Sequence, residues 1–123
     1  MIEAYSQNLT LNAMQVIPFN SVTVEKGCIA KATSPTTFAL NKCGVYMVSC
    51  GVSAAATETI QLYKDGVAVP EARRTGNSPS FCTLVQVRDN NSCCACDSPV
   101  ILQVMSVTAA TLADANITIT KIC

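Results

Sequence analysis

The stretch GVYMVSCGVS, residues 44–53, decides the fold class of this chain. Its large apolar side chains recur at every second position, which is the period of an extended strand and not of a helix. The set that falls on one side of such a strand is Tyr46, Val48, Cys50 and Val52. We therefore expect a long β-strand that buries this side in the core.

Strand-like segments continue on both sides of this stretch. Downstream, residues 59–64 alternate and are followed by Asp65-Gly66, the kind of pair that a tight hairpin prefers, and then by residues 67–70. The other segments with a strand-like pattern are 5–11, 22–25, 28–32, 36–40, 81–88, 99–107 and 115–122. The last of them is β-branched nearly throughout, so we expect it in the middle of a sheet. No stretch has good helical periodicity, and about 8–10 short strands predict an all-β antiparallel sandwich or barrel.

Length and composition narrow the possible functions. With 123 residues the chain is expected to form a single domain over residues 1–123. Its residues are 50% hydrophobic and only 13% charged, so much of the surface is expected to face another subunit. Eight Lys and Arg balance eight Asp and Glu, which leaves no positive field to attract nucleic acid or an anionic membrane. No apolar run approaches the roughly 20 residues that a membrane-spanning helix needs.

The composition also excludes several kinds of catalytic site. The chain has no His, which rules out hydrolysis by a Ser/His or Cys/His pair within one chain. Most of the eight acidic residues fall at predicted turns, where we expect solvated carboxylates and not the facing pair that a glycosidase requires. The sequence contains no Gly-rich phosphate loop. We therefore predict no enzymatic activity and no cofactor.

Six of the eight Cys fall into two groups by their sequence context; the other two are Cys28 and Cys43. Cys50 and Cys82 lie inside alternating apolar runs, where a free Cys behaves as a small hydrophobic core residue. The second group lies in the turn-rich stretch 89–99 or at the end of the sequence and comprises Cys93, Cys94, Cys96 and Cys123.

Four interpretations apply to the thiols of the second group: a metal site, a redox pair, inert thiols and cross-linking thiols. Cys93 and Cys96 have the C-x-x-C spacing of zinc sites, but a structural zinc site needs four ligands and no second pair is present within one chain. A zinc site shared between subunits is the alternative, because a second subunit would supply the missing ligands. A redox C-x-x-C normally opens a helix after a strand, and the flanking Asn, Ser, Asp and Pro do not fit that context. The thiols are then either inert and reduced, or they oxidise and cross-link neighbouring chains, so all four are candidate intersubunit thiols.

A predicted loop around Gly76 carries two adjacent cations. Arg73, Arg74 and Asn77 are its candidate partner-binding residues, and a plain solvated loop is the alternative. The first seven residues have neither a basic segment nor an apolar run, so we expect no secretory signal and synthesis in the host cytoplasm.

Two motifs resemble a known family. Residues 40–49 and 60–70 are similar to C1q/TNF-like jelly rolls of bacterial and phage proteins, in which a strand of the form G-x-Y-x-(V/I)-S is followed by a hairpin reading L-x-x-(N/D)-G-x-x-(I/V)-P. The matching positions are Gly44, Tyr46, Val48, Ser49, Leu62, Asp65, Gly66, Val69 and Pro70. The resemblance implies an antiparallel jelly-roll β-sandwich. The domain is similar to the C-terminal domains of bacterial collagen-like proteins, but this sequence has no Gly-x-y repeat, which disfavours a spore-surface role.

The resemblance also suggests a function. A trimer of jelly rolls buries one apolar flank of each subunit around a three-fold axis, which would account for the low charge. We expect a non-enzymatic, homotrimeric virion protein, a capsid decoration or head-fibre protein of a tailed phage of gut bacteria. It would bind other capsid proteins and lie on the virion surface. The alternatives are a module that binds a host-surface glycan or protein through the loops 73–79 and 93–99, or a disulfide-linked extracellular or spore fibre subunit.

Overall fold

The computed structural model of the chain describes residues 1–26, 30–87 and 100–122. Within these ranges it contains eleven β-strands and no helix, and therefore no helix of the length and hydropathy needed to span a bilayer. The strands are β1 (Ile2–Leu11), β2 (Gln15–Val16), β3 (Ser21–Glu25), β4 (Ala30–Ser34), β5 (Thr37–Leu40), β6 (Gly44–Ala54), β7 (Glu58–Lys64), β8 (Val67–Gly76), β9 (Ser80–Val87), β10 (Val100–Ser106) and β11 (Ala110–Lys121). The two-residue β2 is the strand that the sequence pattern did not predict.

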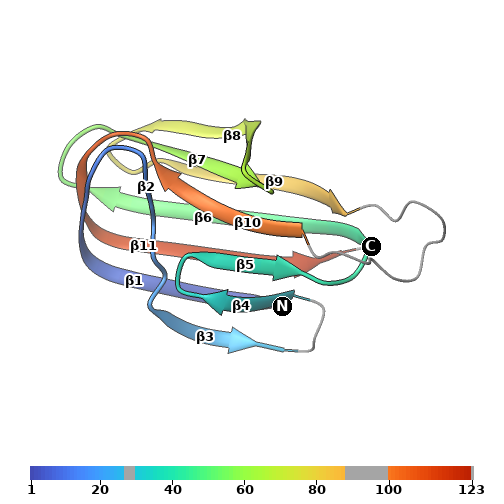
Figure 1. Cartoon of the computed structure of the whole chain (residues 1–123). Coiled ribbons are helices and arrows are strands. Elements are labelled where there is room, and N and C mark those ends of the chain that lie inside the picture. The colour runs from blue at the N-terminus through green and yellow to red at the C-terminus, as the bar shows by residue number, and fades with distance from the viewer. Residues whose placement is uncertain (27–29, 88–99, 123) are drawn as a thin grey trace.

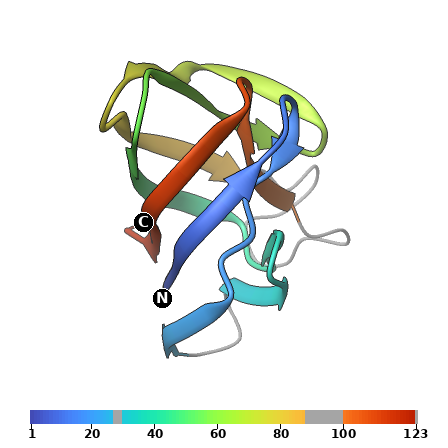
Figure 2. The same cartoon turned by 90° about the vertical axis from the view of Figure 1, so that its left-hand side faces the viewer.

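The strands form two antiparallel sheets that face each other (Figures 1 and 2). Sheet A has the order β3-β1-β11-β6-β9, and sheet B has the order β4-β5-β10-β7-β8 with β2 added beside β10. Most connections pass from one sheet to the other, as from β5 to β6, from β6 to β7 and from β10 to β11. This arrangement confirms the predicted antiparallel jelly-roll sandwich.

The centre of sheet A is the C-terminal strand, as its β-branched sequence predicted. β11 pairs with β1 on one side and with β6 on the other, over nearly its whole length. Ile117 and Ile119 point between the sheets and are fully buried. Because β1 and β11 are antiparallel neighbours, the N-terminus lies beside the last residues of β11 at one end of the sandwich (Figure 1).

The core lies between the inward sides of the two sheets. The predicted buried set on β6 is confirmed, since Tyr46, Val48, Cys50 and Val52 are at most 5% exposed. The Tyr46 hydroxyl donates a hydrogen bond to the carbonyl oxygen of Lys42 at 2.7 Å, so the buried ring keeps a partner for its polar end.

The predicted hairpin at Asp65-Gly66 is also confirmed. Asp65 has φ of 51° and Gly66 has φ of 81°, the left-handed conformations of a type I′ turn. The Asp65 carboxylate accepts a hydrogen bond from the backbone N–H of Ile101 at 2.8 Å, which ties the turn to β10. After the turn, β8 continues well beyond the predicted residues 67–70, as far as Gly76.

Candidate functional site: a charge-poor sheet face and an adjoining groove

The outward side of sheet A gathers apolar side chains from four strands. Met47 on β6 lies between Thr120 on β11 and Leu84 on β9 in the cross-strand register. One step further along, the N–H of Ile122 donates to the carbonyl oxygen of Val45 at 2.8 Å, which places these two residues side by side. Cross-strand neighbours point to the same side of a sheet, so these side chains form one continuous surface.

This surface holds most of the large apolar side chains that the described residues expose. Five of the eight exposed large hydrophobic residues alternate with inward-pointing neighbours on sheet A and therefore point outward: Met1, Tyr5, Met47, Leu84 and Ile122. Their exposed fractions range from 37% to 57%. Apolar residues gathered on one side of a domain mark an interaction surface, whereas single scattered ones do not.

Charged residues are missing from the same part of the sheet. The outward positions of β6, β9 and the second half of β11 are Val45, Met47, Ser49, Gly51, Ser53, Ser80, Cys82, Leu84, Gln86, Asn116, Thr118 and Thr120. None of them is charged. We call these residues, with Met1, Tyr5 and Ile122, the charge-poor face. Two charged residues adjoin it: Glu3 lies between Met1 and Tyr5 on β1, opposite Thr118, and the exposed Asp114 on β11 lies opposite Ser53.

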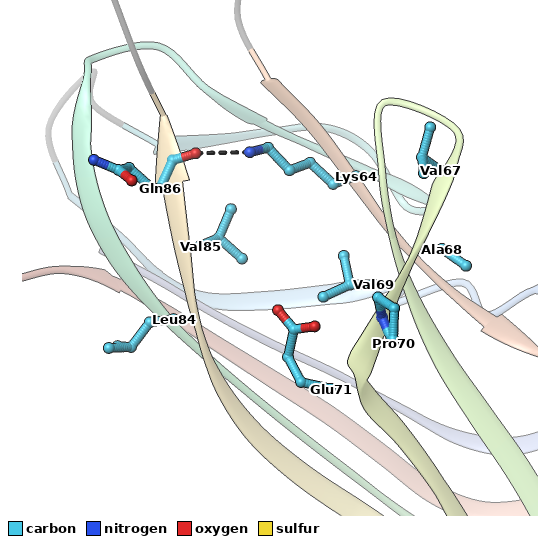
Figure 3. A pocket seen from close by; sticks show the side chains of 9 residues that line it. All are labelled: Lys64, Val67, Ala68, Val69, Pro70, Glu71, Leu84, Val85 and Gln86. Carbon is cyan, nitrogen blue, oxygen red and sulfur yellow. Dashed lines mark hydrogen bonds between the residues drawn. The ribbon is translucent and has the colours of Figure 1, made fainter.

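A groove adjoins the charge-poor face at the edge of the sandwich. It has a volume of about 380 Å³ and lies between β8 and β9, the edge strands of the two sheets (Figure 3). Its apolar lining is Val67, Ala68, Val69, Pro70, Leu84 and Val85. Lys64 donates a hydrogen bond from Nζ to the carbonyl oxygen of Gln86 at 2.7 Å and so links the two sheets across the groove. Leu84 belongs both to the groove and to the charge-poor face, so the two surfaces are continuous.

A bulge in β8 builds one wall of the groove. In the ladder between β7 and β8, Gln61 pairs with Arg73 but Tyr63 pairs with Ala68, so residues 69–72 of β8 bulge out opposite Leu62. The buried Gln61 amide fills the bulge and donates from Nε2 to the carbonyl oxygens of Val69 and Ala72. Pro70 fits here because a bulged residue on an edge strand needs no N–H for the ladder.

The prediction that Arg73 and Arg74 lie in a loop is wrong. Arg73 and Arg74 are inside strand β8, because the hairpin strand continues past the bulge. Arg74 donates from its guanidinium to the carbonyl oxygens of Glu71 at 3.3 Å and of Arg73 at 2.8 Å. Asn77 does lie in the turn after β8, but it holds the β6–β7 connection: its Oδ1 accepts from Thr57 Oγ1 at 3.4 Å and its carbonyl oxygen accepts from the Ala54 N–H at 2.8 Å. A partner for these residues stays a prediction.

The two Cys predicted for the core have different positions. Cys50 is buried, and desolvation raises the pKa of its thiol from 9.0 to about 12. Cys82 is exposed on the charge-poor face, opposite Ser49. The prediction for Cys82 is wrong because the apolar residues on either side of it, Phe81 and Val85, belong to the inward set of β9 and Cys82 does not.

The candidate intersubunit thiols lie outside the described residues: Cys93, Cys94, Cys96 and Cys123. Their redox state and any shared metal site therefore stay predictions. In the described part of the chain, no three His, Cys, Asp or Glu residues gather closely enough to hold a metal ion.

The sequence predicted an apolar flank but not the residues that form it. The available signal was that β6 and β9 carry apolar residues in both alternating sets, for example Met47 among the outward residues of β6 and Leu84 among those of β9. A sandwich strand whose outward side faces only water needs apolar residues in its inward alternating set alone. Apolar residues in the outward set as well indicate that another surface covers the outward side.

Comparisons with solved structures agree with this fold. The chain is similar to the globular domain of zebrafish complement 1qA protein, with a TM-score of 0.76 and 10% identity, over 99% of this chain and 96% of that one. It is similar to rabbit GITRL, with a TM-score of 0.64 and 13% identity over 100% and 95% of the two chains. Murine APRIL matches with a TM-score of 0.65 and 11% identity over 94% and 96%. At these identities the likeness confirms the C1q/TNF-like jelly roll and does not extend to function.

No protein-family model and no curated protein matches the sequence.

Proposed function

We propose that this chain is a non-enzymatic structural module that assembles into a homotrimer through the charge-poor face and the adjoining groove. The observation that carries the proposal is the concentration of exposed Met1, Tyr5, Met47, Leu84 and Ile122 on one side of sheet A. Burial of such apolar surface against another copy contributes about 25 cal/mol of free energy per Å² and so stabilises an oligomer.

The two surfaces favour a ring over a two-fold dimer. The charge-poor face is the outward surface of sheet A, whereas the groove is a recess between β8 and β9. A contact in which the face of one copy meets the groove edge of the next is heterologous, and heterologous contacts close into rings when the rotation permits. The predicted three-fold symmetry comes from the resemblance to C1q/TNF-like jelly rolls, and the confirmed fold supports it.

The absence of catalysis is part of this proposal. The whole sequence has no His, and the described residues gather no set of metal ligands. Apart from the neighbouring Glu3 and Asp114, the face offers hydroxyl, amide and apolar groups, which suits packing against a surface and not proton transfer.

The oligomeric state tests the proposal directly. We expect the wild-type protein, in reductant, to sediment at three times the chain mass of 12.9 kDa. Met47→Lys places a charge in the centre of the face and should give a folded monomer. Met14→Lys is the matched control, because Met14 is 54% exposed in the turn after β1, outside the face and the groove.

Three results would contradict the proposal: a monomeric wild type, a Met47→Lys protein that remains trimeric, or equal dissociation by both variants. Polymers that appear only without reductant would instead support the disulfide-linked fibre. Circular dichroism of each variant separates dissociation from unfolding.

At a finer level, we propose that the trimer decorates the capsid, or forms a head fibre, of a tailed phage of gut bacteria. The resemblance of residues 40–49 and 60–70 to jelly rolls of phage and bacterial proteins supports this role. Mass spectrometry of particles purified from cells that produce the phage is the test. Recovery of the chain in fixed ratio to the major capsid protein would support the virion role, and its absence from pure particles would contradict it.

A further inference from the structure

The two surfaces of the proposed contact carry charges of opposite sign. The charged residues that adjoin the charge-poor face, Glu3 and Asp114, are both acids. Strand β8, which forms one wall of the groove, carries two cations, Arg73 and Arg74, and one acid, Glu71. A contact between the face of one copy and the β8 edge of the next therefore brings acids towards cations, whereas a contact between two faces brings acid towards acid.

Glu3 belongs to a row of residues that crosses sheet A. It is opposite Thr118 on β11. Thr118 is opposite Ser49 on β6, and Ser49 is opposite Cys82 on β9. Neighbouring strands are about 4.8 Å apart, so β1 lies roughly 14 Å from β9. Glu3 is thus level with Cys82 along the strands, but it lies far from the β8–β9 edge of its own copy.

Arg74 lies near the same level on the groove edge. Glu71 and Leu84 line the groove from its two sides (Figure 3). Strands β8 and β9 run in opposite directions, and residues 77–79 connect them (Figure 1). Arg74, three residues beyond Glu71 on β8, is therefore level with a point about three residues before Leu84 on β9, next to Cys82.

Arg74 leaves its strand on the side of sheet A. It is the register partner of Ile60, which is fully buried between the sheets, whereas Arg73 is the partner of Gln61 and starts from the other side of β8. The hydrogen bonds of Arg74 to the carbonyl oxygens of Glu71 and Arg73 both come from Nη1 and hold the guanidinium beside the bulge. A guanidinium has five N–H groups, so donors on Nε and Nη2 remain for a carboxylate.

A ring with its axis along the strands brings the two groups together. The charge-poor face and the groove edge both extend along the strands, so they meet over their length only if the rotation axis runs roughly in that direction. Rotation about an axis does not change the height of a residue along it. The row of Glu3 in one copy then meets Arg74 of the next copy at the same height.

We propose that Glu3 of one copy forms an ion pair with Arg74 of the next copy and so sets the register of the trimer. This inference rests on the proposed assembly through the charge-poor face. Within the described part of the chain, neither side chain forms an ion pair. An exposed pair adds little affinity, but each copy gives its acid to one neighbour and its cation to the other, which fixes the direction of a heterologous ring.

Charge reversal in the full chain tests the pair by sedimentation. Glu3→Lys and Arg74→Glu should each raise the concentration of half-dissociation by about tenfold, because every contact then holds two like charges. The double variant Glu3→Lys/Arg74→Glu restores an opposite pair and should return to within about threefold of the wild type. Circular dichroism of each variant shows whether it is folded.

Arg73→Glu is the matched control, because it makes the same change of charge one residue away, on the other side of β8. Glu3→Lys/Arg73→Glu should stay as weak as Glu3→Lys. Rescue of Glu3→Lys by Arg73→Glu, or of Asp114→Lys by Arg74→Glu, would overturn the register. A monomeric wild type would contradict the proposed assembly as well, whereas a wild-type trimer that neither reversal weakens would contradict the ion pair alone.

Zero-length cross-linking is a second measurement that needs no destabilised variant. Arg74→Lys keeps the positive charge, and a carbodiimide should join the introduced amine to the Glu3 carboxylate as an amide. In trimers mixed from ¹⁴N- and ¹⁵N-labelled chains, the cross-linked peptides should include pairs of mixed isotope, because the two groups are too far apart within one copy. A trimer without this cross-link, or with cross-linked pairs of a single isotope only, would overturn the proposal.

Discussion

At the scale of single residues, Cys50 and Cys82 have opposite environments although similar sequence surrounds them. Cys50 belongs to the inward set of β6 and is buried among apolar neighbours, whereas Cys82 belongs to the outward set of β9. The thiolate is the reactive form of cysteine, so burial protects Cys50 in two ways, by excluding the reagent and by disfavouring ionisation.

We predict that a maleimide distinguishes the two thiols at neutral pH. Cys82 should react in the monomeric Met47→Lys variant and be protected in the wild-type oligomer, because it lies on the proposed contact surface. Cys50 should react in neither until the protein is unfolded. Peptide mass mapping after a labelling pulse measures both sites, and rapid labelling of Cys82 in the oligomer would place the contact elsewhere.

We also predict a loss of stability at alkaline pH that arises from Cys50. Burial raises the pKa of this thiol from 9.0 to about 12, so between these values the unfolded chain releases a proton that the folded chain keeps. The stabilisation is complete below pH 9 and is lost as the pH rises towards 12. Urea unfolding of Cys50→Ala should show a flatter pH dependence over this range than the wild type. Equal slopes would contradict the burial argument.

At the scale of elements, the hairpin of β7 and β8 combines a local feature with a long-range one. Its turn follows from Asp65-Gly66, which adopt positive φ with little cost. Its bulge at residues 69–72 depends on Gln61, whose amide satisfies the carbonyl oxygens of Val69 and Ala72. The turn sets the register near the loop, and the bulge then shifts it and shapes the groove.

We expect Gly66→Ala to lower the free energy of unfolding by about 1–2 kcal/mol, the cost of a left-handed alanine. No atom lies within 4 Å of the position that the added Cβ would take, so the effect is on the backbone alone. Gly51→Ala is the control, because its Cβ would lie 3.5 Å from the nearest atom, the Ser80 Cβ, and its φ is not strained. Denaturant titration in the Met47→Lys background separates these effects from assembly. A neutral Gly66→Ala would contradict the type I′ assignment.

We expect Gln61→Leu to destabilise the chain by about 1–3 kcal/mol, because it leaves buried carbonyl oxygens of the bulge without a donor. Gln103→Leu, at a half-buried outward position of β10, should change stability by less than about 0.5 kcal/mol. Thermal unfolding of the two variants in the monomeric background compares them. Equal effects would show that the amide of Gln61 is not what supports the bulge.

At the scale of the whole molecule, few charged residues lie on the outward side of sheet A. The outward residues of β6, β9 and the second half of β11 include no charged group, and Glu3 and Asp114 lie next to them, while the cations of β7 and β8 lie at the opposite sheet and the edge. An assembly through such a surface depends on apolar burial and little on ion pairs.

We therefore predict that the oligomer is insensitive to ionic strength. Its dissociation constant should change by less than about threefold between low and high salt, because screening acts on charges and the contact has few of them, Glu3 on β1 and Lys64 and Glu71 at the groove. Analytical ultracentrifugation over a salt series measures this. A dissociation constant that rises steeply with salt would point to an interface built on the charged residues outside the charge-poor face.

Features that depend on neighbouring residues could be predicted from the sequence alone. Alternation identified the buried side of β6, the Asp65-Gly66 pair identified the hairpin turn, and β-branched residues identified β11 as a central strand. Each of these follows from backbone preferences and from burial of one side of a strand. An apolar flank was also predictable from composition, though not its residues.

The tertiary structure alone decided the features that need partners distant in the sequence. The position of Arg73 and Arg74 inside β8 depends on the bulge that Gln61 supports, and the outward position of Cys82 depends on which alternating set of β9 faces sheet B. Glu58 meets Ser106 across 48 residues of sequence, so no local pattern could reveal that this carboxyl group is buried. Short-range rules choose strands and turns, but which side chains meet is settled when the two sheets pack.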